Sequence, residues 1–119
     1  MEKVNLAEKL ARIPEYWTPR IVAELNGQHV KLSRFRGPFV WHRHAAEDEL
    51  FLVVRGRFRM DFRDRAVWLA EGEMLVVPRG VEHRPVAEEE ACVLLFEPAG
   101  TLNTGDAGGP LTVPDPERI

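Results

Sequence analysis

The strongest constraint on the fold is a change of hydrophobic period at residue 20. From there to about residue 98, apolar and polar residues alternate in short segments, and turn signals with Gly or Pro recur about every 8–12 residues. Asn26-Gly27 is the strongest hairpin signal among them. We count about nine or ten strands, one of them over residues 38–44, with residues 83–86 and 91–96 as two separate strands. This pattern predicts an all-β antiparallel sandwich or barrel.

The two ends of the chain lack this strand-like alternation. Residues 4–13 predict one short helix, with Asn5 as its N-cap and Glu8 three residues later. Residues 99–119 are rich in Gly and Pro and have no sustained period, which predicts an irregular, extended C-terminal tail. We therefore expect a single domain with a helix and lead-in over 1–19, a barrel over 20–98 and a tail over 99–119.

Composition narrows the class of protein. The chain has 119 residues, one cysteine and a net charge of −3 from 16 basic and 19 acidic residues. A weakly acidic domain without a basic tail is a poor candidate for nucleic-acid binding. No apolar run approaches the ~20 residues that span a bilayer, and the charged first ten residues do not resemble a signal peptide. We expect a cytoplasmic protein that binds neither nucleic acid nor membrane.

Three of the four histidines occupy positions that favour a metal site. His42 and His44 are two residues apart, so on a strand both side chains project from one face. Glu49 follows a turn, so the alternation of side chains along the His42 strand does not decide which way Glu49 points. His83 follows a tight corner at residues 78–80. Three imidazoles and one carboxylate suit Fe, Mn, Ni, Zn or Cu. Taken singly, each has a plainer interpretation: an exposed histidine pair, a solvated carboxylate, a surface turn residue.

The surroundings of these residues form two short motifs. The first runs from Gly37 through His42, His44 and Glu49 to Gly56, with six residues between the last two. This arrangement resembles the first motif of the cupin superfamily, which is a Gly, H-x-H, a few residues, Glu, six residues and Gly. One residue fewer than usual separates Gly37 from His42.

Fifteen residues separate Gly56 from the start of the second motif. It runs Gly72, five residues, Pro78, one residue, Gly80, two residues, His83, three residues and Ala87. It matches the second cupin motif at every position but the last, where Ala87 replaces Asn. The whole pattern is similar to small single-domain cupins of the mannose-6-phosphate-isomerase-like type.

The resemblance implies a fold and a ligand set. Cupins are small antiparallel jelly-roll barrels that bind one metal inside. Carried over residue by residue, the family's ligands fall on His42, His44, Glu49 and His83. The implied cofactor is one divalent transition metal, and no catalytic residue is assigned.

The alternation of inward and outward side chains along each strand predicts what surrounds that metal. Val40, Phe51, Val53 and Met60 are expected to point inward and line a mostly apolar pocket. The same parity places no Arg or Lys inside the barrel. The segment over 50–54 is apolar on both faces and must be covered on both, and small cupins commonly dimerise, so we expect a homodimer.

Two classes of function fit these features. The first is a metal-dependent enzyme acting on a small molecule, with a dioxygenase favoured over a sugar isomerase or epimerase because a sugar-phosphate enzyme needs a cation in the barrel. The alternative is a non-catalytic module that binds or senses a metal or small ligand.

Overall fold

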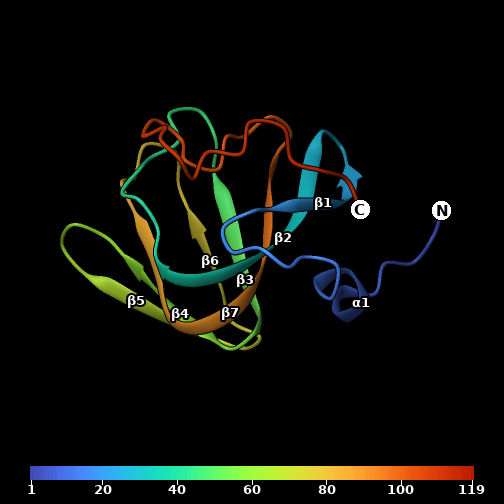
Figure 1. Ribbon diagram of the computed structural model, residues 1–119. Coiled ribbons are helices and arrows are strands. Elements are labelled where there is room, and N and C mark those ends of the chain that lie inside the picture. Colours follow the sequence, from blue (N-terminus) through green and yellow to red (C-terminus); the bar gives the residue numbers. More distant parts are fainter.

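The computed structural model describes residues 1–119 and is built almost entirely of antiparallel strands (Figure 1). Its one helix, α1, covers Leu6–Leu10. The strands are β1 (Arg20–Leu25), β2 (Gln28–Pro38), β3 (Glu49–Arg55), β4 (Arg57–Asp61), β5 (Ala66–Ala70), β6 (Met74–Val77) and β7 (Arg84–Pro98).

The longest strand, β7, organises the sheet. The main path is β1-β2-β7-β3-β6, and β4 pairs with both β5 and β7. The second half of β7 lies between β2 and β3, whereas its first residues pair with β4. Because one strand serves both groups, the sheet curves around an interior and forms the expected barrel (Figure 1).

Two local features allow the tight connections. Asn26 and Gly27 both have positive φ in the β1–β2 hairpin, as the sequence predicts. Gly56, between β3 and β4, has a φ of +80°, and a Cβ there would lie 2.7 Å from the Glu90 carbonyl oxygen. The β3–β4 turn thus crosses β7 so closely that only glycine fits.

The predicted strand count is wrong: the structure has seven strands, not nine or ten. Residues 39–48 form a loop in which only His42 makes an isolated bridge, because no neighbouring strand runs alongside the rest of that segment. The predicted strands at 83–86 and 91–96 are parts of one strand, β7. The helix is also shorter than predicted, although Asn5 caps it through the Glu8 amide at 3.0 Å as expected.

The barrel interior holds the main hydrophobic core of thirteen buried residues, among them Phe35, Phe51, Phe58 and Met60. A smaller cluster lies outside, where Leu10 and Ile13 pack on Leu32 and Cys92 of the sheet. The helix therefore covers part of the outer face of β2 and β7.

The tail from residue 99 to residue 119 contains no helix or strand, and it runs across one end of the barrel before ending beside β1 (Figure 1). The last residue of the tail is bonded to the barrel, because the Ile119 amide donates to the Ile21 carbonyl at 3.0 Å. Near the start of the tail, Thr101 and Thr104 are buried. The helix α1 is neither long nor apolar enough to cross a bilayer.

Candidate metal centre

The four predicted ligands come together at the end of the barrel that the tail covers. His42 and His83 approach from opposite sides and exchange two backbone hydrogen bonds, from His42 N to His83 O at 3.0 Å and from His83 N to His42 O at 2.9 Å. This isolated bridge fixes the 39–48 loop against the residue that precedes β7. Two ligands far apart in the sequence are thereby held side by side.

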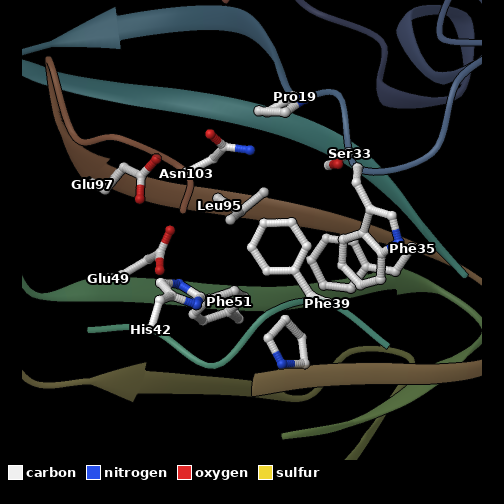
Figure 2. Close-up of a pocket in the computed structure, with 12 residues that line it drawn as sticks. Pro19, Ser33, Phe35, Phe39, His42, Glu49, Phe51, Leu95, Glu97 and Asn103 are labelled. Atoms are coloured by element: carbon white, nitrogen blue, oxygen red, sulfur yellow. The ribbon is translucent and has the colours of Figure 1, made fainter. Parts of the chain in front are cut away.

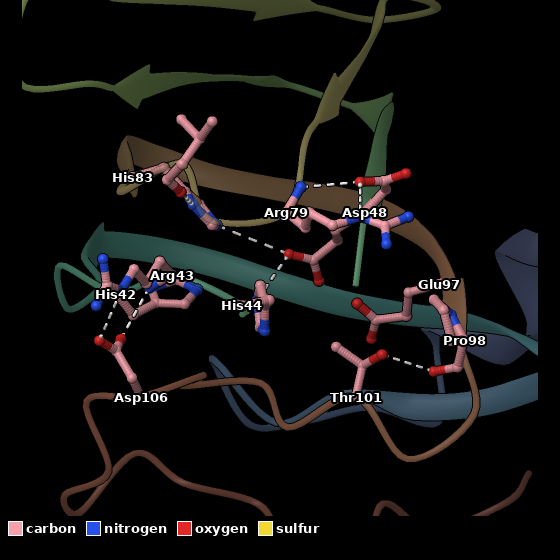
Figure 3. Close-up of polar contacts among 12 residues, drawn as sticks. His42, Arg43, His44, Asp48, Arg79, His83, Glu97, Pro98, Thr101 and Asp106 are labelled. Carbon is pink, nitrogen blue, oxygen red and sulfur yellow. Dashed lines mark hydrogen bonds and ion pairs between the residues drawn. The ribbon is translucent and has the colours of Figure 1, made fainter. Parts of the chain in front are cut away.

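The other two ligands are placed by the same loop. Glu49 is the first residue of β3, and His44 precedes it across the turn. The Gly80 amide donates to the His44 carbonyl at 2.8 Å, and the Arg79 amide donates to Asp48 Oδ1 at 2.8 Å (Figure 3). The corner at residues 78–80 thus anchors the His44 segment as well as leading into His83.

The four side chains form a compact, buried cluster. One potential ligand atom from each of His42, His44, Glu49 and His83 lies within 4.8 Å of the others, and each residue is at most 4% exposed. His44 Nε2 is 3.2 Å from Glu49 Oε1, and His83 Nε2 is 3.8 Å from the same oxygen (Figure 3). The structure therefore brings together the whole predicted ligand set.

Hydrogen bonds set the tautomers of two of the rings. His42 Nδ1 is 2.9 Å from the Val40 carbonyl oxygen, and His83 Nδ1 is 2.9 Å from that of Val81. A carbonyl oxygen only accepts, so both Nδ1 atoms carry the proton and both Nε2 lone pairs are free. Backbone carbonyls are frequent partners of metal-ligating histidines in this arrangement.

Four polar atoms of the cluster lack hydrogen-bond partners. Both ring nitrogens of His44, Nε2 of His83 and Oε1 of Glu49 are buried without a hydrogen bond. Buried polar groups are normally satisfied, so a concentration of such atoms in one place requires an explanation. A cation held by three imidazoles and a carboxylate would satisfy them, and this donor set suits a divalent transition metal.

The surroundings of His42 and Glu49 shift their pKa values toward the protonation states that can bind a metal. Desolvation, then the neighbouring His83, lowers the pKa of His42 to about 4, so its ring is neutral at pH 7. Burial alone would raise the pKa of Glu49, but the influence of its buried neighbours Glu97, His44 and His83 outweighs burial and holds that pKa below its usual range. Neutral imidazoles and an ionised carboxylate are the ligating forms.

A small cavity borders the cluster. His42, Glu49 and Glu97 lie at its polar end, and four aromatic side chains form most of its apolar wall (Figure 2): Trp17, Phe35, Phe39 and Phe51. About 30 Å³ of it is reachable by the centre of a water molecule, which is room for roughly two or three waters. The cavity therefore suits a molecule of few non-hydrogen atoms.

The predicted pocket residues are only partly in the cavity wall. Phe51 lines the cavity. Val53 and Met60 point inward but are packed within the hydrophobic core, and Val40 packs against that core half-buried. Parity correctly identifies inward positions, but it does not tell which inward side chains border a space and which fill it.

Sequence reasoning missed a charged pair inside the barrel. Lys31 of β2 and Glu97 of β7 are each 2% exposed, and Lys31 Nζ donates to Glu97 Oε1 at 2.8 Å and to the Thr101 carbonyl at 3.3 Å. The expectation of no Lys or Arg in the interior is therefore wrong. Lys31 shares the inward parity of Ser33, and this alternation was the available signal.

Glu97 also lies beside the cluster of candidate ligands. Its second oxygen, Oε2, is buried without a partner, and the residue lines the cavity beside Glu49 (Figure 2). Burial and the Glu49 carboxylate raise the pKa of Glu97, while Lys31 opposes that rise. Lys31 is thus occupied by Glu97 and offers no free positive charge to a ligand.

The chain is thus a curved antiparallel barrel that buries three histidines and a glutamate in one cluster suited to metal binding. The sequence model of the cupin domain matches residues 22–97, so the chain belongs to the cupin family. The matched region contains all four clustered residues and ends before the tail.

Individual relatives agree with this assignment. A crystal structure of a cupin-2 domain protein from Shewanella frigidimarina is 43% identical, with a TM-score of 0.79 over 80% of this chain and 93% of that one. YdbB of Bacillus subtilis (strain 168) is 38% identical over 64 residues, which are 53% of this chain and 57% of YdbB. That match spans less than two thirds of this curated relative.

A more distant structure shares the fold alone. Hydroquinone 1,2-dioxygenase PnpCD, solved in complex with Fe3+, is 15% identical to this chain. Its TM-score is 0.74 over 83% of this chain and 33% of the dioxygenase chain.

Proposed function

We propose that the protein binds one divalent transition metal through His42, His44, Glu49 and His83. The observation that carries the proposal is the set of buried ligand atoms that have no hydrogen-bond partner although they lie within 4.8 Å of one another. Leaving several such atoms unsatisfied costs about 1–3 kcal/mol each, and a bound cation would recover that cost. The donor set is compatible with Fe, Mn, Ni, Zn or Cu.

We further propose that this centre belongs to an enzyme acting on a small molecule, with oxygen-dependent oxidation as the reaction class. A metal in this site would supply Lewis acidity or a place where oxygen and substrate meet. The chain's own residues would hold the ligands and the substrate: the Val40 and Val81 carbonyls orient two imidazoles, and the aromatic side chains give the cavity an apolar wall. That the fold is shared with a hydroquinone dioxygenase supports this reaction class.

A sugar-phosphate isomerase is less favoured. Such an enzyme needs a positive charge for the phosphate, and the interior Lys31 is neutralised by Glu97 at 2.8 Å. The cavity, with room for roughly two or three waters, is also small for a phosphorylated sugar.

A non-catalytic binding or sensing module is the second candidate. The small, mostly apolar cavity favours it, because such a space would hold a small molecule. Asp48, an acidic side chain near the cluster, is engaged by Arg79 and is therefore not free to act as a base in the cavity.

Oxygen uptake separates these candidates. Protein reconstituted with Fe(II), and separately with Mn(II) or Ni(II), is mixed with pools of small metabolites in an oxygen electrode, with His44→Ala as the control. The proposal predicts uptake that needs both metal and a pool component and that His44→Ala abolishes. Retention of a pool component in native mass spectrometry without uptake or conversion would establish the binding module instead.

We also propose that the protein works as a homodimer. Met74 and Val76 on the edge strand β6 are 64% and 52% exposed, and Leu50 and Leu52 beside them on β3 are only half-buried. These four side chains form one apolar outer face that α1 does not cover. A second copy of the chain would bury it. The cytoplasmic location stays a prediction.

A further inference from the structure

We infer that the turn Thr104–Asp106 of the C-terminal tail is a positioning element that holds the His42 segment in its metal-binding place. The inference rests on the proposed metal site for its functional consequence, but the contacts themselves lie in the tail. They fall outside residues 22–97, the part of the chain that matches the cupin domain. The tail is therefore part of this protein's site and not only a covering of its surface.

The first contact is a close approach of backbones at Gly105. This residue has a φ of +52°, and a Cβ on it would lie 2.3 Å from the Arg43 carbonyl oxygen and 3.1 Å from His42 Cδ2. The Arg43 oxygen belongs to the main chain and cannot move aside cheaply. The tail therefore packs directly on the ring of one ligand and on the peptide that links it to the next.

The second contact is a reciprocal pair of hydrogen bonds at Asp106. The Asp106 amide donates to the Arg43 carbonyl at 3.1 Å, and the Arg43 amide donates to Asp106 Oδ1 at 2.9 Å (Figure 3). Arg43 lies between His42 and His44. Asp106 thus satisfies both the amide and the carbonyl of Arg43. This matters because the 39–48 loop that contains Arg43 is not part of a strand.

The third observation is that hydrogen bonds within the tail stabilise the turn. Asn103 Nδ2 donates to the Leu111 carbonyl at 2.9 Å, and the Val113 amide donates to Asn103 Oδ1 at 2.9 Å. Thr104 is fully buried, and its hydroxyl lies 2.6 Å from that of Thr112. These hydrogen bonds within residues 103–113 fix the conformation of the turn. The turn can therefore hold Arg43 in a defined position.

Gly105→Ala tests the inference, with Gly108→Ala as the matched control. Gly108 is in the same tail and has a φ of +63°, but a Cβ there meets nothing within 4 Å. Both variants carry the same strain of a left-handed alanine, and only one must push the tail off the His42 segment. The difference between them isolates the contact from the cost of the substitution.

Two readouts are measured on the full chain. The first, on metal-free protein, is hydrogen exchange of the amides of residues 42–44, and we expect faster exchange in Gly105→Ala than in Gly108→Ala. The second is release of Zn2+ or Mn2+ from loaded protein to a chelator, and we expect it to be faster in Gly105→Ala by roughly tenfold or more, the usual effect of losing a group that orients a ligand.

Asp106 supplies an independent pair of variants that keeps the inference testable if Gly105→Ala does not fold. Asp106→Ala removes the acceptor for the Arg43 amide and should speed exchange and metal release by roughly threefold to tenfold. Asp106→Asn keeps an oxygen in the same place and should restore values near wild type.

The outcomes separate the inference from the proposed function. Equal exchange at residues 42–44 in Gly105→Ala and Gly108→Ala, with Asp106→Ala also at the wild-type value, would overturn the inference. Failure of the wild-type protein to take up metal would overturn the proposed function, while the exchange rates would still decide whether the tail positions His42.

Discussion

The buried pair of Lys31 and Glu97 leads to a prediction whose size follows from burial. Removing one partner of a buried, hydrogen-bonded ion pair leaves the other charge in a medium that solvates it poorly, at a cost of about 3–5 kcal/mol. Both side chains are 2% exposed and 2.8 Å apart. We therefore expect Lys31→Met and Glu97→Gln each to lower the free energy of unfolding by about that amount.

The double variant Lys31→Met/Glu97→Gln should be far less destabilised than the sum of the two, because it leaves no uncompensated charge. A double-mutant cycle in urea on metal-free protein measures the difference, and we expect a coupling of about 2 kcal/mol or more. The control is the surface pair of Arg63 and Glu82, which has a similar separation of 2.7 Å but is 59% and 45% exposed. Its coupling should be much smaller.

The pH dependence of Lys31→Met sharpens this prediction. Burial and the Glu49 carboxylate already raise the pKa of Glu97, and loss of Lys31 raises it further. A raised carboxyl pKa means that the folded state binds the proton more tightly than the unfolded state, so stability falls as pH rises through that pKa. Lys31→Met should therefore be more destabilised near pH 8 than near pH 5. Additive single and double effects, or a coupling no larger than that of the surface pair, would refute this account of the barrel interior.

Three further predictions concern the barrel around the site. Met74→Lys, which places a charge on the exposed apolar face of β6, should convert the proposed dimer to a monomer in light scattering at micromolar concentration; a wild type that is already monomeric would contradict the dimer. Gly56→Ala should cost about 1–3 kcal/mol more in urea unfolding than Gly72→Ala, because both have a φ of +80° but only Gly56 faces main chain at 2.7 Å; equal costs would remove the steric argument. A hydrogen bond from Arg59, and then one from a second arginine on β7, lowers the pKa of Asp61, so stability should fall as pH drops below about 4, and Asp61→Asn should flatten that part of the profile.

The ligand cluster could be predicted from the sequence because each ligand lies in a short motif whose spacing is local. His42, His44 and Glu49 fall within one loop and the strand that follows, and His83 follows a corner marked by Pro78. The barrel was predictable for a similar reason, since alternation reports which side of a strand is buried. The number of strands was wrong, because a segment such as 38–44 alternates whether or not a partner strand lies beside it.

The parts that escaped prediction depend on contacts between distant segments. Nothing local marks Lys31 and Glu97 as partners, because the register of β2 against β7 decides that they meet. The role of the tail was equally hidden: a Gly- and Pro-rich stretch without period predicts an irregular chain, and only the position of Gly105 against Arg43 shows what it holds. Alternation identifies inward residues, but the shape of the cavity depends on the complete packing.

Metal content is the most direct test of the central claim that His42, His44, Glu49 and His83 form a metal site. Protein purified without a histidine tag or chelator is analysed for Fe, Mn, Ni, Cu and Zn, beside a His42→Ala variant whose circular dichroism shows a folded barrel. The account predicts close to one metal ion per chain in the wild type and a sharp loss in the variant. A wild type that takes up no metal even after reconstitution, or a variant that retains it fully, would contradict the account.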